Sequence, residues 1–426
     1  MPAKFNEKIK ASQVSRQANL AAAVKKDFQL AKGLSSPIYV YSALWRGDSV
    51  RLVVIKLQKF VFTNLYCVFL QGSSRYDVKA TVRNFYQFKR KYTSAAIICP
   101  ITKENLSFQD NIPLFVDLVE EKNRSSIPKD TFLVESRQIN AKANVSGDWN
   151  KMSERTATRE TKVEFTVCVP AMFGFGDAAL LVEKIEMSRL LGAGRVVLYN
   201  NSIGLNVDAV LRWYIREWEE GRDTLEVAVH SWKLPRVSGQ IVDTPYYAQL
   251  ACIDDCLHRY RWTTKYTEFS DLDEFIIPLH HEGMTELLSA LERRKPGNAG
   301  FMFRSTVFVK DRPMSSYGFE EEARQYRSSI LGYIQRENRI FPQRDRGKLI
   351  VHPSKIEEMG VHSIWEASDP TGFVSAENAL LYHYRLPYPN ECVNLTMDVT
   401  VSERFGSPLA VRLKNVWSKL KGVPLA

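Results

Sequence analysis

Two aspartates, Asp271 and Asp273, stand one residue apart in the otherwise apolar segment FSDLDEFIIP at 269–278. Carboxylates in apolar surroundings are unfavourable unless a partner neutralises them. A hard divalent cation suits them, because Mg²⁺ or Mn²⁺ takes oxygen ligands and keeps positions for water and for nucleotide phosphates. The alternative interpretation is that the second aspartate caps the next turn. The strand-end position and the apolar flanks favour a metal site.

The elements that must position these aspartates alternate between strands and helices. Apolar runs at 165–170, 195–199, 225–230 and 266–269 predict buried strands, and 178–191, 207–219 and 246–258 have helical spacing. This alternation predicts a Rossmann-like α/β fold with a doubly wound, mostly parallel sheet. Ligands of such sheets bind beyond the carboxyl ends of the strands, where the Asp-x-Asp motif is expected.

Two classes of metal-dependent enzyme carry Asp-x-Asp at a strand end. Phosphatases of the haloacid-dehalogenase type place it on the first strand, where the first aspartate is a nucleophile. Nucleotide-sugar glycosyltransferases place it after the nucleotide-binding half of the fold. In this sequence the motif follows several strand–helix units, which favours sugar transfer.

The chain before this region has a different pattern. Short runs of Val, Ile, Tyr and Phe at 38–44, 50–57, 60–70, 78–85, 95–99 and 114–119 are separated by turn residues, as is typical of a β-sandwich. We therefore expect a stem or N-terminal arm at 1–34, a β-rich accessory domain at 35–135 and a linker at 136–160. The α/β domain is expected at 161–400 and a C-terminal extension at 401–426.

An ordered set of motifs resembles glycosyltransferase family 92 over about residues 163–390. The motifs are CVPAMFG at 168–174, Gln249 with DCL at 255–257, TKY at 264–266, DLDEF at 271–275, KLIVHP at 348–353, GVH at 360–362 and HYR at 383–385. The resemblance implies a GT-A fold, inversion at the anomeric carbon, Mn²⁺ and a UDP-sugar donor, usually UDP-galactose. It also implies a glycan or glycoprotein acceptor, or cell-wall galactan.

The donor and the metal are expected to be bound by residues of these motifs. For the metal we expect Asp271 and Asp273, with Asp273 the more direct ligand and Glu274 orienting the turn. A histidine often completes the metal shell in GT-A enzymes, and both His362 and His383 remain candidates. For the nucleotide sugar we expect Gly174, Gln249, Asp255, Asp271, Lys348 and Arg385.

An inverting transfer also needs a general base that takes the proton from the acceptor hydroxyl. The acceptor side is expected between 301 and 346, which holds several acidic residues. Glu337 is our candidate because it follows the metal motif at a suitable interval. Two other functions stay open: a non-catalytic glycan-binding pseudoenzyme and a metal-dependent phosphatase.

The compartment is predicted from cysteines and glycosylation motifs. The sequence has six cysteines and Asn-x-Ser/Thr at Asn105, Asn123, Asn144, Asn200 and Asn394, which favours the Golgi or secretory lumen. Cys67 and Cys99 lie where a related accessory domain has a cysteine pair, so we expect a disulfide between them. Cys256 is a further disulfide candidate, and Cys252 is expected to be packed. Family members have a type II membrane anchor, so membrane association is expected only through a segment that this sequence lacks.

The net charge of +10 raises nucleic acid as a partner. No basic run of five or more residues and no zinc-finger or RNA-recognition signature accompanies this charge. We therefore expect a UDP-sugar and a glycan as partners, and no nucleic acid.

Overall fold

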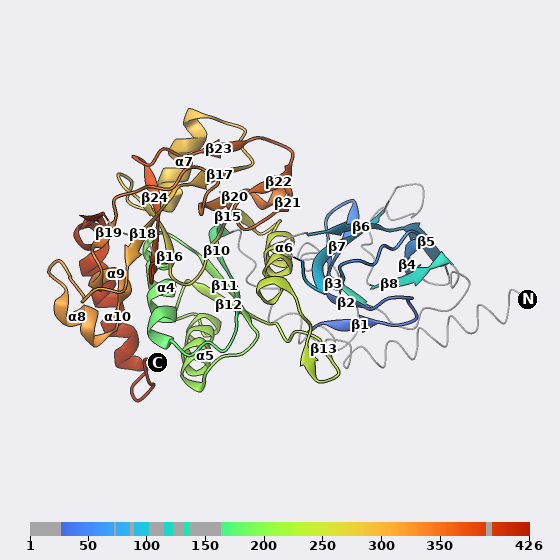
Figure 1. The fold of residues 1–426 in the computed structure, drawn as a ribbon, viewed down its shortest axis with the longest axis horizontal. Helices are drawn as coiled ribbons and strands as arrows, with labels where there is room; N and C mark the ends of the chain where they lie inside the picture. Colours follow the sequence, from blue (N-terminus) through green and yellow to red (C-terminus); the bar gives the residue numbers. More distant parts are fainter. Residues whose placement is uncertain are drawn as a thin grey trace, which may run out of the picture. The chain divides into compact units, whose positions relative to one another are not determined.

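The computed structural model describes residues 27–71, 74–85, 89–101, 115–121, 132–135, 163–388 and 394–426. The chain divides into two compact units (Figure 1). The β unit comprises Met1–Glu160 and Ser231–Arg259, and the α/β unit comprises Thr161–His230 and Tyr260–Ala426. The predicted linker and most of the predicted stem lie outside the described residues, as do Asn105, Asn123, Asn144 and Cys392.

The β unit contains a nine-stranded sheet in the order β5-β4-β8-β9-β2-β3-β7-β6, with β1 paired to β2. Most strands lie on the predicted apolar runs, although the run at 60–70 becomes a strand only from Leu65 and the run at 78–85 is divided between β5 and β6. The bounds are β1 (Gln29–Ala31), β2 (Ile38–Trp45), β3 (Ser49–Leu57), β4 (Leu65–Gln71), β5 (Ser74–Lys79), β6 (Thr81–Asn84), β7 (Tyr92–Pro100), β8 (Phe115–Glu120) and β9 (Phe132–Glu135).

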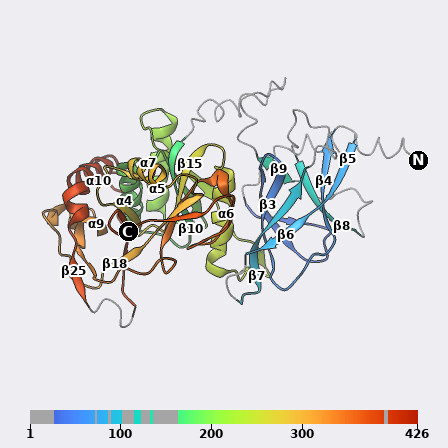
Figure 2. The same cartoon turned by 90° about the horizontal axis from the view of Figure 1, so that it is seen from above.

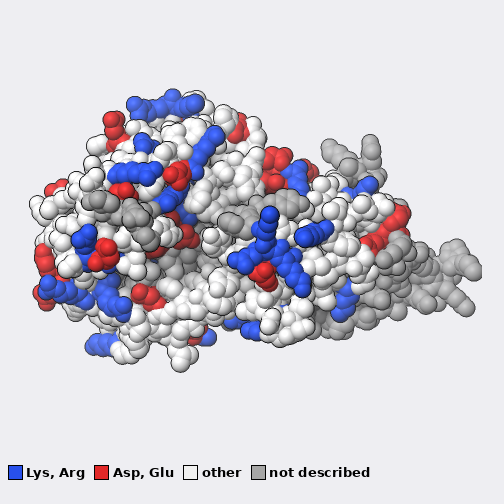
Figure 3. All heavy atoms as spheres, viewed as in Figure 1, with Lys and Arg blue, Asp and Glu red and all other residues white. Residues whose placement is uncertain are grey.

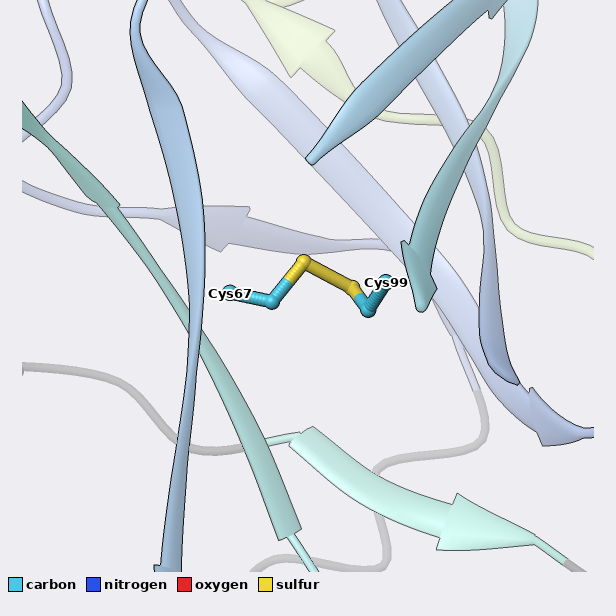
Figure 4. The surroundings of a disulfide bond; sticks show 2 residues. All are labelled: Cys67 and Cys99. Atoms are coloured by element: carbon cyan, nitrogen blue, oxygen red, sulfur yellow. A yellow bond between two sulfur atoms is a disulfide. The ribbon is translucent and has the colours of Figure 1, made fainter. Parts of the chain in front are cut away.

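A disulfide joins Cys67 of β4 to Cys99 of β7, with their Cα atoms 5.8 Å apart (Figure 4). These strands stand near opposite ends of the strand order, so the sheet must fold over for them to meet. Figures 1 and 2 show β4, β5 and β8 grouped together, apart from β3 and β7. The apolar core of the unit includes residues of both groups, and both cysteines belong to it. The predicted cysteine pair is therefore confirmed.

Helix α6 (Gln249–Arg259) belongs to the β unit, although the strand–helix alternation assigned it to the α/β domain. Arg51 of β3 donates to Asp254 of α6 through Nε at 3.0 Å and Nη2 at 2.8 Å, and both side chains are buried. Ser42 of β2 donates to Asp255, which also pairs with Arg259 at 2.9 Å. Buried carboxylates are tolerated here because each one has a cation beside it.

The same segment carries the other cysteine predictions. Cys252 on α6 is buried, as expected, and Cys256 is disulfide-bonded. The segment also includes the short strands β13 (Arg236–Val237) and β14 (Gln240–Ile241), which pair with each other.

The α/β unit is built on a seven-stranded sheet in the order β12-β11-β10-β15-β20-β17-β23. Strand β10 is parallel to β11 and to β15, whereas β20 is antiparallel to both of its neighbours. The strands are β10 (Val163–Met172), β11 (Arg195–Asn200), β12 (Glu226–Ser231), β15 (Thr264–Phe269), β17 (Gly300–Phe303), β20 (Lys348–Val351) and β23 (Thr371–Phe373). The helices between them are α4 (Ala178–Leu190), α5 (Leu205–Glu219) and α7 (Met284–Arg294). The strands predicted at 165–170, 195–199, 225–230 and 266–269 are confirmed, as are the helices α4 and α5, whereas the helix predicted before β15 is α6 of the β unit.

A second sheet of five strands, in the order β16-β24-β18-β19-β25, was not predicted. Its strands are β16 (Glu274–Pro278), β18 (Ser305–Val309), β19 (Gln335–Glu337), β24 (Ala379–Arg385) and β25 (Leu395–Met397). Smaller elements of the unit are α8 (Glu320–Gln325), α9 (Ser329–Gly332), β21 (Ile356–Met359) and β22 (Ile364–Ala367). Because β16 directly follows the Asp-x-Asp motif, this motif lies where the chain passes from one sheet to the other.

The C-terminal residues are part of the α/β core. Helix α10 (Ser407–Lys419) contributes Leu409, Leu413 and Val416 to the same apolar cluster as Phe165 and Leu181. The expectation of an extension at 401–426 is replaced by a helix that closes the core of the unit.

Charge is mixed on the surface that Figure 3 shows. Lys and Arg side chains form several separate groups on this face, and acidic side chains lie beside most of them. Within the described part of the chain, no helix has both the length and the apolar character that a membrane crossing requires.

The Arg51–Asp254 pair gives a stability prediction. Asp254→Ala leaves the buried Arg51 guanidinium without its carboxylate, and we expect the free energy of unfolding to fall by about 3–5 kcal/mol. Asp208→Ala, which removes an exposed partner of Arg212 on α5, is the control and should change it by less than about 1 kcal/mol. Urea denaturation measures both variants, and equal effects would contradict a buried, stabilising pair.

The buried imidazole of His258 predicts a pH dependence. Burial, together with the Arg51 charge, lowers its pKa from 6.5 to about 3. Between these pH values the unfolded chain binds the proton and the folded chain does not, so stability falls as the pH drops below 6.5. From pH 6.5 to 5, hydrogen exchange should show the β-unit strands losing up to about 1.4 kcal/mol per pH unit, and His258→Gln should lack this loss. An unchanged slope in the variant would refute the assignment.

Candidate functional site

The Asp-x-Asp turn lies between the parallel strand β15 and β16. The side chains of Asp271 and Asp273 are 41% and 32% exposed, whereas that of Glu274 is only 4% exposed. The turn therefore presents two accessible carboxylates at the carboxyl edge of β15 and keeps the third inside the protein. Accessible carboxylates can bind a ligand, and the buried one can hold the turn.

Two buried lysines hold this turn in place through hydrogen bonds and ion pairs. Lys348 of β20 is 3% exposed and places its Nζ 2.9 Å from Asp271 Oδ2 and 3.0 Å from Glu274 Oε2. Lys184 of α4 donates to Ser270 Oγ at 2.8 Å and to the Glu274 carbonyl at 2.6 Å. The Glu274 carboxylate in turn accepts the Asp271 backbone N–H at 2.8 Å. Glu274 thus orients the turn, as the sequence predicted.

The pKa values of the two carboxylates that contact Lys348 shift in opposite directions. Loss of hydration would raise the pKa of Asp271, but the Lys348 ammonium outweighs this effect and lowers it. Burial raises the pKa of Glu274, even though Lys348 opposes the shift. Burial would lower the pKa of Lys348, but Asp271 and Glu274 together raise it. Asp271 therefore keeps its negative charge next to a lysine that stays protonated.

His383 lies against the same turn from the neighbouring strand. The antiparallel register of β16 and β24 pairs it with Glu274. Its Nε2 is 3.5 Å from Asp273 Oδ2, and its Nδ1 is 3.5 Å from Glu274 Oε1. Burial would lower the pKa of His383, but its hydrogen bond to Asp273 and the nearby carboxylates raise it. The imidazole is thus oriented by a buried carboxylate on one side and faces an accessible one on the other.

This arrangement could hold a metal through Asp273 and His383. One carboxylate oxygen and one imidazole nitrogen form a donor set that suits Mn²⁺. Among the residues that the structure describes, no group of three or more His, Cys, Asp or Glu side chains could hold a metal ion. A cation at this site would therefore take its other ligands from water or from a bound phosphate, which is usual for metals that bind with nucleotides.

The second histidine candidate, His362, lies beside the site in the loop between β21 and β22. Its Nδ1 is 2.7 Å from the carbonyl oxygen of Gly347, directly before Lys348. Loss of hydration lowers the pKa of His362, and Lys348 and Asp271 influence it in opposite directions. His362 is thus within electrostatic reach of Asp271, whereas the ring nitrogens of His383 lie 3.5 Å from carboxylate oxygens of Asp273 and Glu274.

Glu337 lies on the second sheet, two strands away from His383. Strand β18 pairs Val307 with His383, and its antiparallel pairing of Phe308 with Arg336 places Glu337 beside Val307. Two strand spacings separate the backbones of His383 and Glu337 by about 10 Å. The sheet therefore places the base candidate in the same row as the histidine.

Three predicted donor-binding residues have other partners in the structure. Lys348, expected at a diphosphate, is buried between Asp271 and Glu274 and positions the turn instead. Gly174 has a positive φ of 54°, as suits glycine, but its N–H donates to Ser202 Oγ at 2.7 Å, so that N–H is already used. Asp255 is fully buried in the β unit and pairs with Arg259, so we reassign it from donor binding to packing.

Two other predicted residues remain candidates. Arg385 ends β24, and its charge partly opposes the rise in the pKa of His383; its guanidinium lies 4.3 Å from the centre of the Tyr388 ring. Gln249 is the first residue of α6 and belongs to the β unit. Lys184 is the residue that sequence reasoning missed. It is buried on a helix that is buried on nearly all sides, together with the charged residues Glu183 and Glu186.

Comparison with known proteins gives a consistent result. The model of a family described as glycosyltransferase family 92 matches residues 163–417, which is more than half of the chain. Beta-1,4-galactosyltransferase galt-1 of Caenorhabditis elegans is 29% identical over 234 residues, covering 53% of this chain and 49% of that protein. Galactan beta-1,4-galactosyltransferase GALS3 of Arabidopsis thaliana is 31% identical over 146 residues, covering 33% and 27%.

The chain thus spans about half, or less, of the length of these relatives. Among solved structures, UDP-glucose pyrophosphorylase complexed with UDP-glucose aligns with 61% of this chain at 9% identity. Its TM-score of 0.24 is too low for this likeness to support an argument about the fold.

The role of Lys348 can be tested by stability. Lys348→Met leaves Asp271 and Glu274 without their shared cation, so we expect the free energy of unfolding to fall by about 3 kcal/mol or more. Lys348→Met combined with Glu274→Gln should recover part of this loss, because only the accessible Asp271 then keeps a charge. Lys355→Met, at a lysine 32% exposed, is the control and should change it by less than about 1 kcal/mol. Chemical denaturation measures all three, and additive losses in the double variant would contradict the shared cation.

Proposed function

The chain belongs to glycosyltransferase family 92, and on this premise we propose that it transfers galactose from UDP-galactose to a glycan acceptor, with inversion at the anomeric carbon. Its relatives in two organisms are named galactosyltransferases, which supports galactose as the sugar. The observation that carries the proposal is the pair of accessible carboxylates, Asp271 and Asp273, at the end of β15 and next to His383.

The sheet order supports a GT-A arrangement. The parallel strands β11, β10 and β15 are followed across the sheet by the antiparallel β20. In a sheet of this kind ligands bind at the carboxyl ends of the parallel strands. The Asp-x-Asp turn lies at this edge, so a nucleotide sugar bound there would have its diphosphate near the turn.

For the metal we propose Mn²⁺ held by Asp273 and His383, with Asp271 as an accessible carboxylate for metal or nucleotide. The ion would neutralise the negative charge that develops on the leaving diphosphate. The contact of His383 Nδ1 with Glu274 supports this role, because a metal-binding imidazole commonly has a carboxylate on its other nitrogen. The protein itself supplies the orientation: Glu274 fixes the ring, and Lys348 fixes Asp271.

For the acceptor side we assign Glu337 as the base that removes the hydroxyl proton. In an inverting transfer the acceptor oxygen bonds to the anomeric carbon as the bond from that carbon to the diphosphate oxygen breaks. The proton then goes to the base, and UDP leaves on the opposite face. The strand register supports this arrangement, because it places His383 and Glu337 side by side on β24 and β19, with β18 between them. The metal and leaving group would then lie near His383, and the base would lie two strands away. Arg385, at the end of β24, is our candidate for an additional cation near the diphosphate.

The Cys67–Cys99 disulfide supports a secretory-pathway location for this enzyme. Disulfides persist in oxidising compartments and are rare in the cytosol. We propose the Golgi lumen, where glycans are available as acceptors. Asn394, one of the described glycosylation motifs, is exposed, which is compatible with this compartment.

The Asp273→Asn variant tests the proposed transfer. We expect galactose transfer from UDP-galactose to a galacto-oligosaccharide in the presence of Mn²⁺ to fall by about 100-fold or more, because a charge that stabilises the leaving group is lost. Asp369→Asn is the control, since this exposed aspartate pairs with Lys355 away from the turn. A radiochemical transfer assay measures both.

Three outcomes would contradict the proposal. Galactose transfer that persists in Asp273→Asn would show that Asp273 is not needed to hold a metal ion for the reaction. Release of phosphate without sugar transfer would favour the phosphatase alternative. Glycan binding without turnover in the wild-type protein would favour the pseudoenzyme alternative.

A further inference from the structure

A hollow of about 800 Å³ lies in the β unit, between the end of β3 and the residues that precede β7. We call it the basic pocket. Its lining residues are Leu57, Gln58, Lys59, Phe60, Lys89, Arg90 and Lys91. Its size is within the range of ~300–1,000 Å³ that is typical of sites for small ligands.

Backbone contacts hold the two walls of the basic pocket together. The N–H of Gln58 donates to the Lys91 carbonyl at 3.0 Å, and the N–H of Arg90 donates to the Gln58 side chain at 3.1 Å. Each wall continues directly into a long, paired strand of the nine-stranded sheet, with Leu57 opposite Tyr92. The backbone at the end of the sheet therefore defines the shape of the pocket, together with the side chains that line it.

The charge of the basic pocket is of one sign. Four of its seven lining residues are Lys or Arg, and none is Asp or Glu. Asp243 lies 3.4 Å from Arg90, but both side chains are more than half exposed, so this pair neutralises only part of the charge. Lys59, Lys89 and Lys91 line the pocket and are exposed. Such a concentration of cations attracts an anion.

The apolar part of the pocket narrows the class of ligand. Leu57 and Phe60 are partly buried, and the Phe60 ring packs against Phe62 with 4.7 Å between the ring centres. A pocket lined by an aromatic side chain and by cationic side chains suits a ligand with both apolar faces and negative groups. A sugar chain with acidic substituents has both, because the faces of its rings carry C–H groups. A flat bilayer surface would instead meet protruding side chains and would not fill a hollow.

We propose that the basic pocket binds an acidic saccharide, meaning a sugar chain that carries carboxylate or sulfate groups. The site belongs to the β unit, and its binding does not depend on the proposed transfer. It would give the chain a second glycan contact that is separate from the Asp-x-Asp turn.

The test uses the full chain and isothermal titration calorimetry. A chondroitin sulfate hexasaccharide is titrated into the wild-type protein and into the double variant Lys59→Glu/Lys89→Glu, whose changed side chains are exposed. We expect the variant to bind about tenfold more weakly or worse, since two attractive charges become repulsive. Lys414→Glu/Lys421→Glu is the matched control, because it makes the same change of net charge at exposed lysines of the α/β unit. The control should bind like the wild type.

Four results would overturn the proposal. They are absence of binding to the wild type, equal weakening in both double variants, equal binding of neutral chitohexaose, and binding only to vesicles of anionic phospholipid. Absence of binding would mean that the pocket is not a saccharide site, and equal weakening would indicate a general effect of net charge. Equal binding of chitohexaose would mean that acidic groups are not recognised, and binding only to vesicles would indicate a membrane surface as the partner. Galactose transfer is measured on the same samples, so that the two proposals can fail independently. If the pocket variant loses saccharide binding but keeps transfer activity, the change affects the pocket and not the proposed catalytic site.

Discussion

In the proposed site two neighbouring carboxylates share one buried ammonium group, that of Lys348. Lys348 belongs to the seven-stranded sheet and contacts Asp271 and Glu274, which lie at the start of the five-stranded sheet. Two carboxylates this close would repel each other, and their shared cation removes that repulsion. Glu274 can then stay buried, where it accepts the Asp271 N–H and contacts the His383 ring. The protein itself therefore holds the accessible carboxylates in place, without a bound ligand.

The β unit follows the same rule of neutralised buried charge. Arg51 on β3 and Asp254 on α6 are 203 residues apart in the sequence, yet their side chains form a buried pair. Helix α6 lies inside the region that the family model matches, but it packs with the strands of the β unit. The N-terminal strands are thus more than an appended module, because they neutralise charges that the family region itself carries.

Periodicity was a good guide where the chain repeats one pattern. The strands of the α/β unit up to β15 were predicted because they are continuous apolar runs, and α5 was predicted because it buries an apolar face of regular spacing. The second sheet was missed because its strands are short and separated by long irregular segments, and β19 has only three residues. Asp271 and Asp273 were predicted from their apolar flanks. The contacts of Lys348 with the turn and of Asp255 with Ser42 were not predicted, because pairing between distant segments is decided by tertiary packing and leaves no local signal.

The central claim is that the Asp-x-Asp turn supports inverting galactose transfer. The most direct measurement is proton NMR of the product that the purified chain forms from UDP-galactose, Mn²⁺ and a galacto-oligosaccharide. UDP-galactose carries its sugar in the α configuration, so the account predicts a new β-linked galactose, recognised by the large coupling of its anomeric proton. A new α-linked galactose, or no Mn²⁺-dependent product with any galacto-oligosaccharide, would contradict it.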